Sequence, residues 1–149
     1  MGKAERMKEI REAIDAGNQA LLKLKEAKEK LISAQNWGIF DMFAGGLLVS
    51  YVKRSRIQQA SDCISEAKGS LMRFKRELGD LSQVESLGID VGGFLAFSDY
   101  FFDGVIVDYL VQRKISEAEH QVDEAILKLE SLLRELRCLE TDDASDDQI

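Results

Sequence analysis

Three segments of the chain carry small or apolar side chains at alternating intervals of three and four residues. A spacing that averages about 3.5 residues keeps one face of a helix against a partner helix. The pattern therefore predicts an all-α fold with helices at about 3–35, 46–79 and 104–139. The predicted buried positions are Ile10, Ala13, Gly17, Ala20, Leu24, Ala27, Leu31 and Ala34, then Ile57, Ala60, Ile64, Ala67, Leu71, Phe74 and Leu78, then Ile115, Ala118, Val122, Ala125, Leu129, Leu132 and Leu136.

The second and third segments belong to an internal repeat. Residues 41–78 align with residues 99–136 without a gap, and 13 of the 38 aligned positions are identical. Helical periodicity would account for matched leucines, but not for the matched Tyr51 and Tyr109. Together with the absence of proline, the repeat predicts an elongated antiparallel three-helix bundle, or coiled coil, of long helices. We expect one domain over residues 1–139.

The connections between the predicted helices contain glycine and aspartate. Asp41 and Asp99 are candidate N-caps, because a short carboxylate side chain accepts hydrogen bonds from the first free N–H groups of a helix. The second connection, 80–103, is longer than a bundle needs, so we expect it to hold a short helix around Phe94–Phe97.

The net charge of the chain limits the classes of protein to which it can belong. A formal net charge of −7 disfavours a nucleic-acid-binding protein, which usually carries a basic stripe. Five of the acidic residues lie within 140–149, which we interpret as a disordered acidic tail. Two cysteines without paired spacing, and an N-terminus that runs directly into charged helical sequence, predict a cytoplasmic protein.

Two apolar segments, 37–52 and 91–111, are the least ordinary part of the sequence. Asp99, Asp103 and Asp108 interrupt the longer one, and each would cost about 2.5–3.5 kcal/mol near a bilayer centre, so we predict no transmembrane helix. Our first interpretation is that these segments pack across the bundle ends or form the interface of a homo-oligomer. The candidate interface residues are Trp37, Phe40, Phe43, Phe94, Phe97, Tyr100, Phe101 and Phe102.

The alternative for the same regions, 37–56 and 94–114, is contact with a membrane surface. Basic residues follow each apolar run, and an apolar face beside a basic cluster is typical of peripheral membrane proteins. The candidate contacts with anionic lipid are Lys53, Arg54, Arg56, Arg113 and Lys114.

The sequence offers no complete catalytic or metal-binding constellation. Glu117 and His120 have the Glu-x-x-His spacing of di-iron bundles, but such a site needs two of these pairs, and we expect His120 to point outward. Cys63 lies next to Ile64, one of the predicted buried positions that form the seam of the second helix. It is interpreted as a small, partly buried apolar residue. Asp41 and Asp99, with Asp103 and Asp108, are expected to cap helices or face solvent. We therefore expect no cofactor, no bound metal and no enzymatic activity.

A short motif carries one resemblance. The segment Trp37-Gly38-x-x-Asp41-x-x-x-Gly45-Gly46, followed by an apolar run and a basic cluster, resembles a segment of uncharacterised bacterial coiled-coil proteins. The resemblance implies no activity. The sequence thus predicts a non-enzymatic helical interaction or scaffold module that self-associates or binds a helical protein partner.

Overall fold

The described part of the chain is almost entirely helical. The computed structural model describes residues 2–44, 47–80, 91–112 and 114–146, apart from the side chains of residues 3, 37–53, 80, 103, 105 and 142–146. These residues contain no strand, which confirms the all-helical class. The elements are α1 (Lys3–Ala44), α2 (Leu47–Asp80), α3 (Val91–Tyr100), the π-helical turn η2 (Phe101–Val105), α4 (Ile106–Val111) and α5 (Ile115–Asp146).

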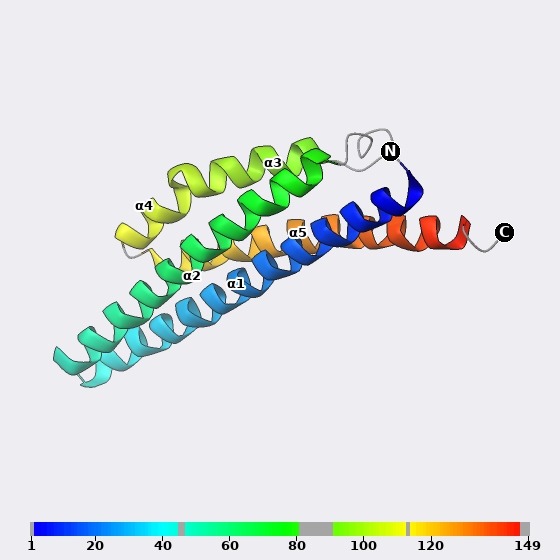
Figure 1. Ribbon diagram of the computed structural model, residues 1–149. Helices are drawn as coiled ribbons and strands as arrows, with labels where there is room; N and C mark the ends of the chain where they lie inside the picture. Colours follow the sequence, from blue (N-terminus) through cyan, green and yellow to red (C-terminus); the bar gives the residue numbers. More distant parts are fainter. Residues whose placement is uncertain (1, 45–46, 81–90, 113, 147–149) are drawn as a thin grey trace.

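The helices form four antiparallel rods (Figure 1). α1 and α2 make a long hairpin, the run α3–η2–α4 returns along α2 as a shorter rod, and α5 completes the bundle beside α1. The start of α1 and the end of α5 therefore lie at the same end of the bundle. At the opposite end, the tip of the α1–α2 hairpin projects beyond α4 and α5.

α1 lies at the centre of the packing, against α2 on one side and α5 on the other. Its predicted seam is buried from Ile10 to Ala34, and the seams of α2 and α5 are buried as well, apart from the partly buried Ile57. The heptad prediction is therefore confirmed for all three long helices. Burial of these side chains on facing helices stabilises the bundle by about 25 cal/mol for each Å² of apolar surface removed from water.

Gly17 lies where side chains of α2 and α5 both pack closely against α1. A Cβ atom placed on this residue would lie 2.5 Å from Leu133 Cδ2 and 3.0 Å from Phe74 Cε2. Phe74 belongs to α2 and Leu133 to α5, so the absence of a side chain on α1 lets both neighbours fill the same space. Glycine is costly inside a helix, by about 1 kcal/mol relative to alanine, and here close packing accounts for it.

Ion pairs join α1 to both neighbours. Lys23 Nζ lies 2.8 Å from Glu66 Oε2 on α2, and Lys28 Nζ lies 2.6 Å from Asp123 Oδ1 on α5. The hydrogen bond to Glu66, with the charge of Glu26, raises the pKa of Lys23, and the hydrogen bond and charge of Asp123 raise the pKa of Lys28. Both pairs are partly exposed to solvent, which screens their charges, so each adds little to stability.

The helix boundaries differ from the sequence predictions in three places. α1 continues to Ala44 instead of ending near residue 35, so Asp41 is inside a helix and the N-cap prediction for it is wrong. Asp99 also lies inside a helix, α3, and is not an N-cap. α5 continues to Asp146, so residues 140–146 of the predicted disordered tail are helical; Glu140 pairs there with Arg11 at 3.3 Å, and 147–149 lie outside the described residues.

The predicted three-helix bundle with a structural repeat is not confirmed, because residues 91–111 form a rod of their own. The short helix expected around Phe94–Phe97 is present as α3. The predicted helix 104–139 is divided: the backbone leaves the helical conformation at Gly104 (φ 160°, ψ −26°) and again between α4 and α5. Around that second break the Lys114 N–H donates to the Tyr109 carbonyl at 2.8 Å, whereas the corresponding stretch of α2 is continuous helix.

Candidate interaction surfaces

An aromatic cluster on α3 and η2 occupies the space between α2 and α5. Phe94 meets Phe74 of α2 edge to face, with ring centroids 6.0 Å apart, and Phe101 contacts Phe97 at 6.0 Å and Phe102 at 4.7 Å. The ammonium group of Lys128 on α5 lies 5.1 Å from the centroid of the Phe97 ring. These contacts anchor the α3–η2–α4 rod, which we call the third rod, to the bundle.

The cluster shows where the candidate interface residues lie. Phe94 and Phe101 are buried inside the chain itself, and Phe97 and Phe102 are partly buried against the core. Tyr100, in contrast, is 63% exposed. The side chains of Trp37, Phe40 and Phe43 lie outside the described residues, although their backbone belongs to the last turns of α1.

The outer face of the α3–η2–α4 rod is a first candidate surface, which we call the outer stripe. It consists of Gly93, Ala96, Tyr100, Val107 and Val111, which are exposed, together with the half-buried Gly104. These residues follow one another at intervals of three or four, although the helical conformation is interrupted at Gly104. Val107 is 51% exposed and Val111 76% exposed, while Ile106 and Leu110 on the inner side of the same rod are buried. A helix that is apolar on both sides is usually covered on both sides.

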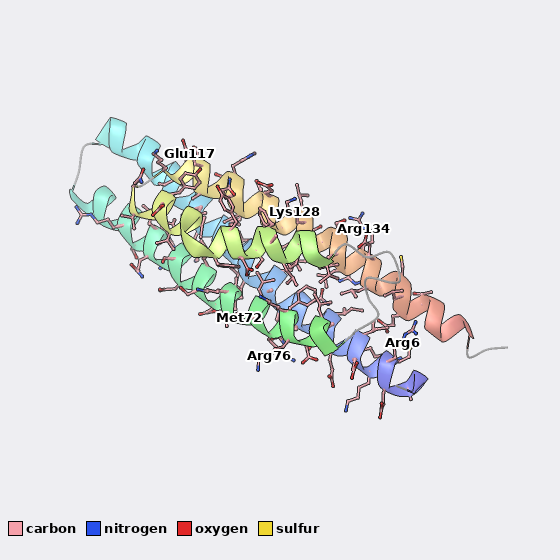
Figure 2. The ribbon with its side chains drawn as sticks, turned by 90° about the horizontal axis from the view of Figure 1, so that it is seen from above. Arg6, Met72, Arg76, Glu117, Lys128 and Arg134 are labelled. Carbon is pink, nitrogen blue, oxygen red and sulfur yellow. The ribbon has the colours of Figure 1, made fainter. Side chains whose placement is uncertain are left out.

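The space between α2 and α3 forms a second candidate surface, a groove of about 640 Å³. Its α2 wall presents Met72 and Arg76, both of which project outward from that helix in Figure 2. The groove is lined by Lys68, Leu71, Met72, Lys75, Arg76 and Gly79 of α2, by Leu95, Ser98 and Asp99 of α3, and by Phe102 of η2. Sequence reasoning missed this groove.

The candidate contacts with anionic lipid are not gathered on one described surface. Arg54 and Lys114 are exposed, whereas Arg56 is half-buried and donates a hydrogen bond to Gln59 at 3.0 Å. The side chain of Lys53 and all of Arg113 lie outside the described residues. No helix in the described ranges is long and apolar enough to cross a membrane.

The groups considered for chemistry are dispersed. His120 and Glu117 are both exposed and line, with Tyr109, Ser116 and Gln121, a shallow hollow of about 240 Å³. Asp99 and Asp108 are exposed on the third rod, whereas the side chains of Asp41 and Asp103 are outside the described set. Among the described residues, no three His, Cys, Asp or Glu side chains lie close enough together to hold a metal ion.

Cys63 is held in a state that disfavours the thiolate. Its Sγ lies 3.8 Å from Glu26 Oε2 and can donate its S–H to that carboxylate. Burial of the thiol raises its pKa, and the nearby charges of Glu26 and Glu66 raise it further. Because the thiolate is the reactive form, Cys63 is a poor nucleophile at neutral pH.

The fold and these two surfaces define an all-helical bundle with exposed apolar faces. Comparison of the chain with protein families, with curated proteins and with solved structures finds no match in any of the three.

Proposed function

We propose that this protein is a non-enzymatic helical interaction module that self-associates through the outer stripe. The observation that carries the proposal is the exposure of Tyr100, Val107 and Val111 on a rod whose inner side is already buried. A cytoplasmic location belongs to the same proposal, as does the view that segments 41–78 and 99–136 derive from one duplicated helical unit.

The glycines of the rod support a close approach by another chain. A Cβ atom on Gly104, within the outer stripe, would meet no atom within 4 Å, so packing within the chain does not require glycine there. Gly17, where a Cβ would collide with two neighbouring helices, shows the contrast. Small residues on an outer helix face let a second helix axis come near.

The outer stripe is self-complementary in size. If two copies pair antiparallel about a two-fold axis near residue 102, midway between Tyr100 and Gly104, Tyr100 of each copy faces Gly104 of the other, and Val107 faces Ala96. Val111 then faces Gly93, so each large side chain meets a small one. A two-fold axis places the same patch on both partners, as a closed homodimer requires. The stripe is about 28 Å long and narrower than a standard interface, which corresponds to a weak, concentration-dependent dimer.

The test is the mass of the particle in solution. We expect sedimentation equilibrium to give a mass above one chain that falls on dilution, and Val107→Lys with Val111→Lys to give a monomer. The matched control is Leu22→Lys with Leu127→Lys, because these leucines are 58% and 68% exposed at scattered positions. A strictly monomeric wild-type protein at high concentration contradicts self-association.

The orientation of the pair is tested by disulfide formation in a Cys63→Ser, Cys138→Ser background. Antiparallel pairing brings Ala96 of one copy to Val107 of the other, so Ala96→Cys with Val107→Cys should cross-link two chains, and Ala96→Cys alone should not. Cross-linking by the single variant would indicate parallel pairing instead.

Contact with a membrane surface is the second candidate function, favoured by the position of the exposed Val107 and Val111 shortly before the exposed Lys114. Flotation with anionic vesicles at low salt separates the two functions. Co-flotation that disappears on Arg54→Glu with Lys114→Glu would support the membrane surface, and its absence leaves the interaction module.

A further inference from the structure

The groove between α2 and α3 has an apolar floor. Leu71 is 6% exposed and forms part of the core, while Leu95 and Phe102 are partly buried against that core from the opposite wall. Met72 stands on the α2 side with 59% of its surface exposed. Methionine is flexible and polarisable, and it is common on surfaces that receive apolar side chains of a partner helix.

The rim of the groove is basic, although the protein as a whole carries a net charge of −7. Lys68, Lys75 and Arg76 lie along the α2 wall, whereas Asp99 is the single acidic side chain among the residues that line the described groove. Lys75 Nζ lies 3.9 Å from Asp99 Oδ1, and both side chains are more than half exposed, so this pair is weak. The groove thus retains a positive rim around an apolar floor.

The shape of the groove favours an elongated occupant. Its α2 wall runs from Lys68 to Gly79, about 16 Å along the helix, and its two walls are antiparallel helices (Figure 2). Pockets for small molecules enclose most of the ligand surface, whereas a channel that is open along its length between two helices matches the way an amphipathic helix docks.

We infer that this groove binds an acidic amphipathic helix of another protein, whose apolar side chains at intervals of three or four residues contact Leu71, Met72 and Phe102. Its flanking carboxylates pair with Lys68 and Arg76, which lie on either side of Met72 along α2. This inference rests on the proposed role as a helical interaction module and names the partner class for a surface distinct from the outer stripe.

The experiment uses the full chain and a labelled, designed peptide of about 16 residues, or about 24 Å as a helix. The peptide carries leucine on one face and glutamate on the other, and its binding is measured by fluorescence anisotropy. We expect saturable binding that weakens as salt is added, because salt screens charges at the rim. A peptide with lysine in place of every glutamate, and an acidic peptide with serine in place of every leucine, should each bind at least tenfold more weakly.

Protein variants locate the binding. Lys68→Glu with Arg76→Glu should weaken the acidic peptide at least tenfold, and Met72→Ser should weaken it about threefold. The matched control, Lys8→Glu with Arg134→Glu, reverses the same number of exposed charges elsewhere and should leave the affinity within twofold. Circular dichroism of each variant checks that the fold is kept.

The outcomes separate this inference from the proposed function. Equal binding of acidic and basic peptides, or no binding by the wild-type protein, overturns the inference even if the protein self-associates. Loss of self-association in Lys68→Glu with Arg76→Glu would assign the groove to a second copy of the chain and also overturns it. Binding of anionic vesicles that Lys68→Glu with Arg76→Glu abolishes, without binding of the acidic peptide, would assign the groove to a lipid surface and overturn it as well. Peptide binding by a strictly monomeric wild-type protein supports the groove while contradicting self-association.

Discussion

α2 and α5 are the corresponding helices of the two sequence copies, and they differ beside their shared seam. Ile126 and Leu133 of α5 are 6% and 0% exposed, whereas the aligned positions of α2 are Lys68 and Lys75 on the rim of the groove. α5 therefore buries side chains beside its seam as well as on it, and it packs against both α1 and the α3–η2–α4 rod. α2 has one buried face and an open edge.

The apolar seam of each helix accounts for its pairing with another helix. The side chains next to the seam, lysine on α2 and apolar on α5, account for the difference in burial on the second side of each helix. Lysine keeps its ammonium group in water, so Lys68 and Lys75 leave exposed on α2 the positions that Ile126 and Leu133 bury on α5. Two of the positions that differ between the copies thus lie on the rim of the groove, beside seams that are identical at five of seven positions.

We expect the largest change in the free energy of unfolding when a residue of one copy is replaced by the aligned residue of the other. Leu133→Lys places an ammonium group in the core opposite Gly17 and Phe74 and should lower the free energy of unfolding by about 4 kcal/mol. The reverse exchange, Lys75→Leu, changes an exposed side chain and should shift it by no more than about 0.5 kcal/mol. Urea denaturation measures both, and similar values would show that α2 and α5 are covered alike.

A smaller difference is expected at the aligned leucines. Leu129 is 0% exposed, so Leu129→Ala should cost about 3 kcal/mol through lost burial and a closed cavity. Leu71 borders the groove, where water can enter the space that a truncation leaves, so Leu71→Ala should cost about 2 kcal/mol. Thermal or urea unfolding compares them; a larger cost at Leu71 would contradict an open edge on α2.

The smallest expected effect is an increase in stability. Gly69 of α2 aligns with Leu127 of α5, and a Cβ on Gly69 would meet no atom within 4 Å. Gly69→Ala should therefore raise the free energy of unfolding by about 0.5–1 kcal/mol, because alanine favours the helix. Gly17→Ala is the control: its Cβ would crowd Phe74 and Leu133, so it should destabilise by about 1 kcal/mol. A gain at both positions would show that the core tolerates the extra atom.

Much of this fold was predictable from the sequence. The three seams from Ile10 to Leu136 gave the buried faces correctly, because burial between helices restricts those positions to small or apolar side chains. The boundaries were less predictable. Asp41 has the chemistry of an N-cap, yet nothing nearby forces α1 to stop, since glycine weakens a helix without ending it and proline is absent.

The candidate surfaces were predictable only in part. Aromatic residues of 94–102 were identified as interface candidates, but their hydrophobicity alone does not tell a side chain that packs inside the chain, such as Phe101, from one on its surface, such as Tyr100. The signal for the groove was present in the sequence: Lys68 and Lys75 align with the apolar Ile126 and Leu133 of the other copy. This signal is found only by comparing the two copies at positions next to the seam, because the heptad pattern does not predict which residue types occur there.

The central position of α1 also has a consequence for biosynthesis. α1 is synthesised before α5, one of its two apolar neighbours, so residues such as Leu24 and Leu31 stay incompletely covered until α5 has left the ribosome. The α1–α2 hairpin can form early because its contacts are local, whereas completion of the core waits for residues beyond 115. Until then, the nascent chain presents a strip of alanine and leucine that chaperones, or a neighbouring nascent chain, can reach.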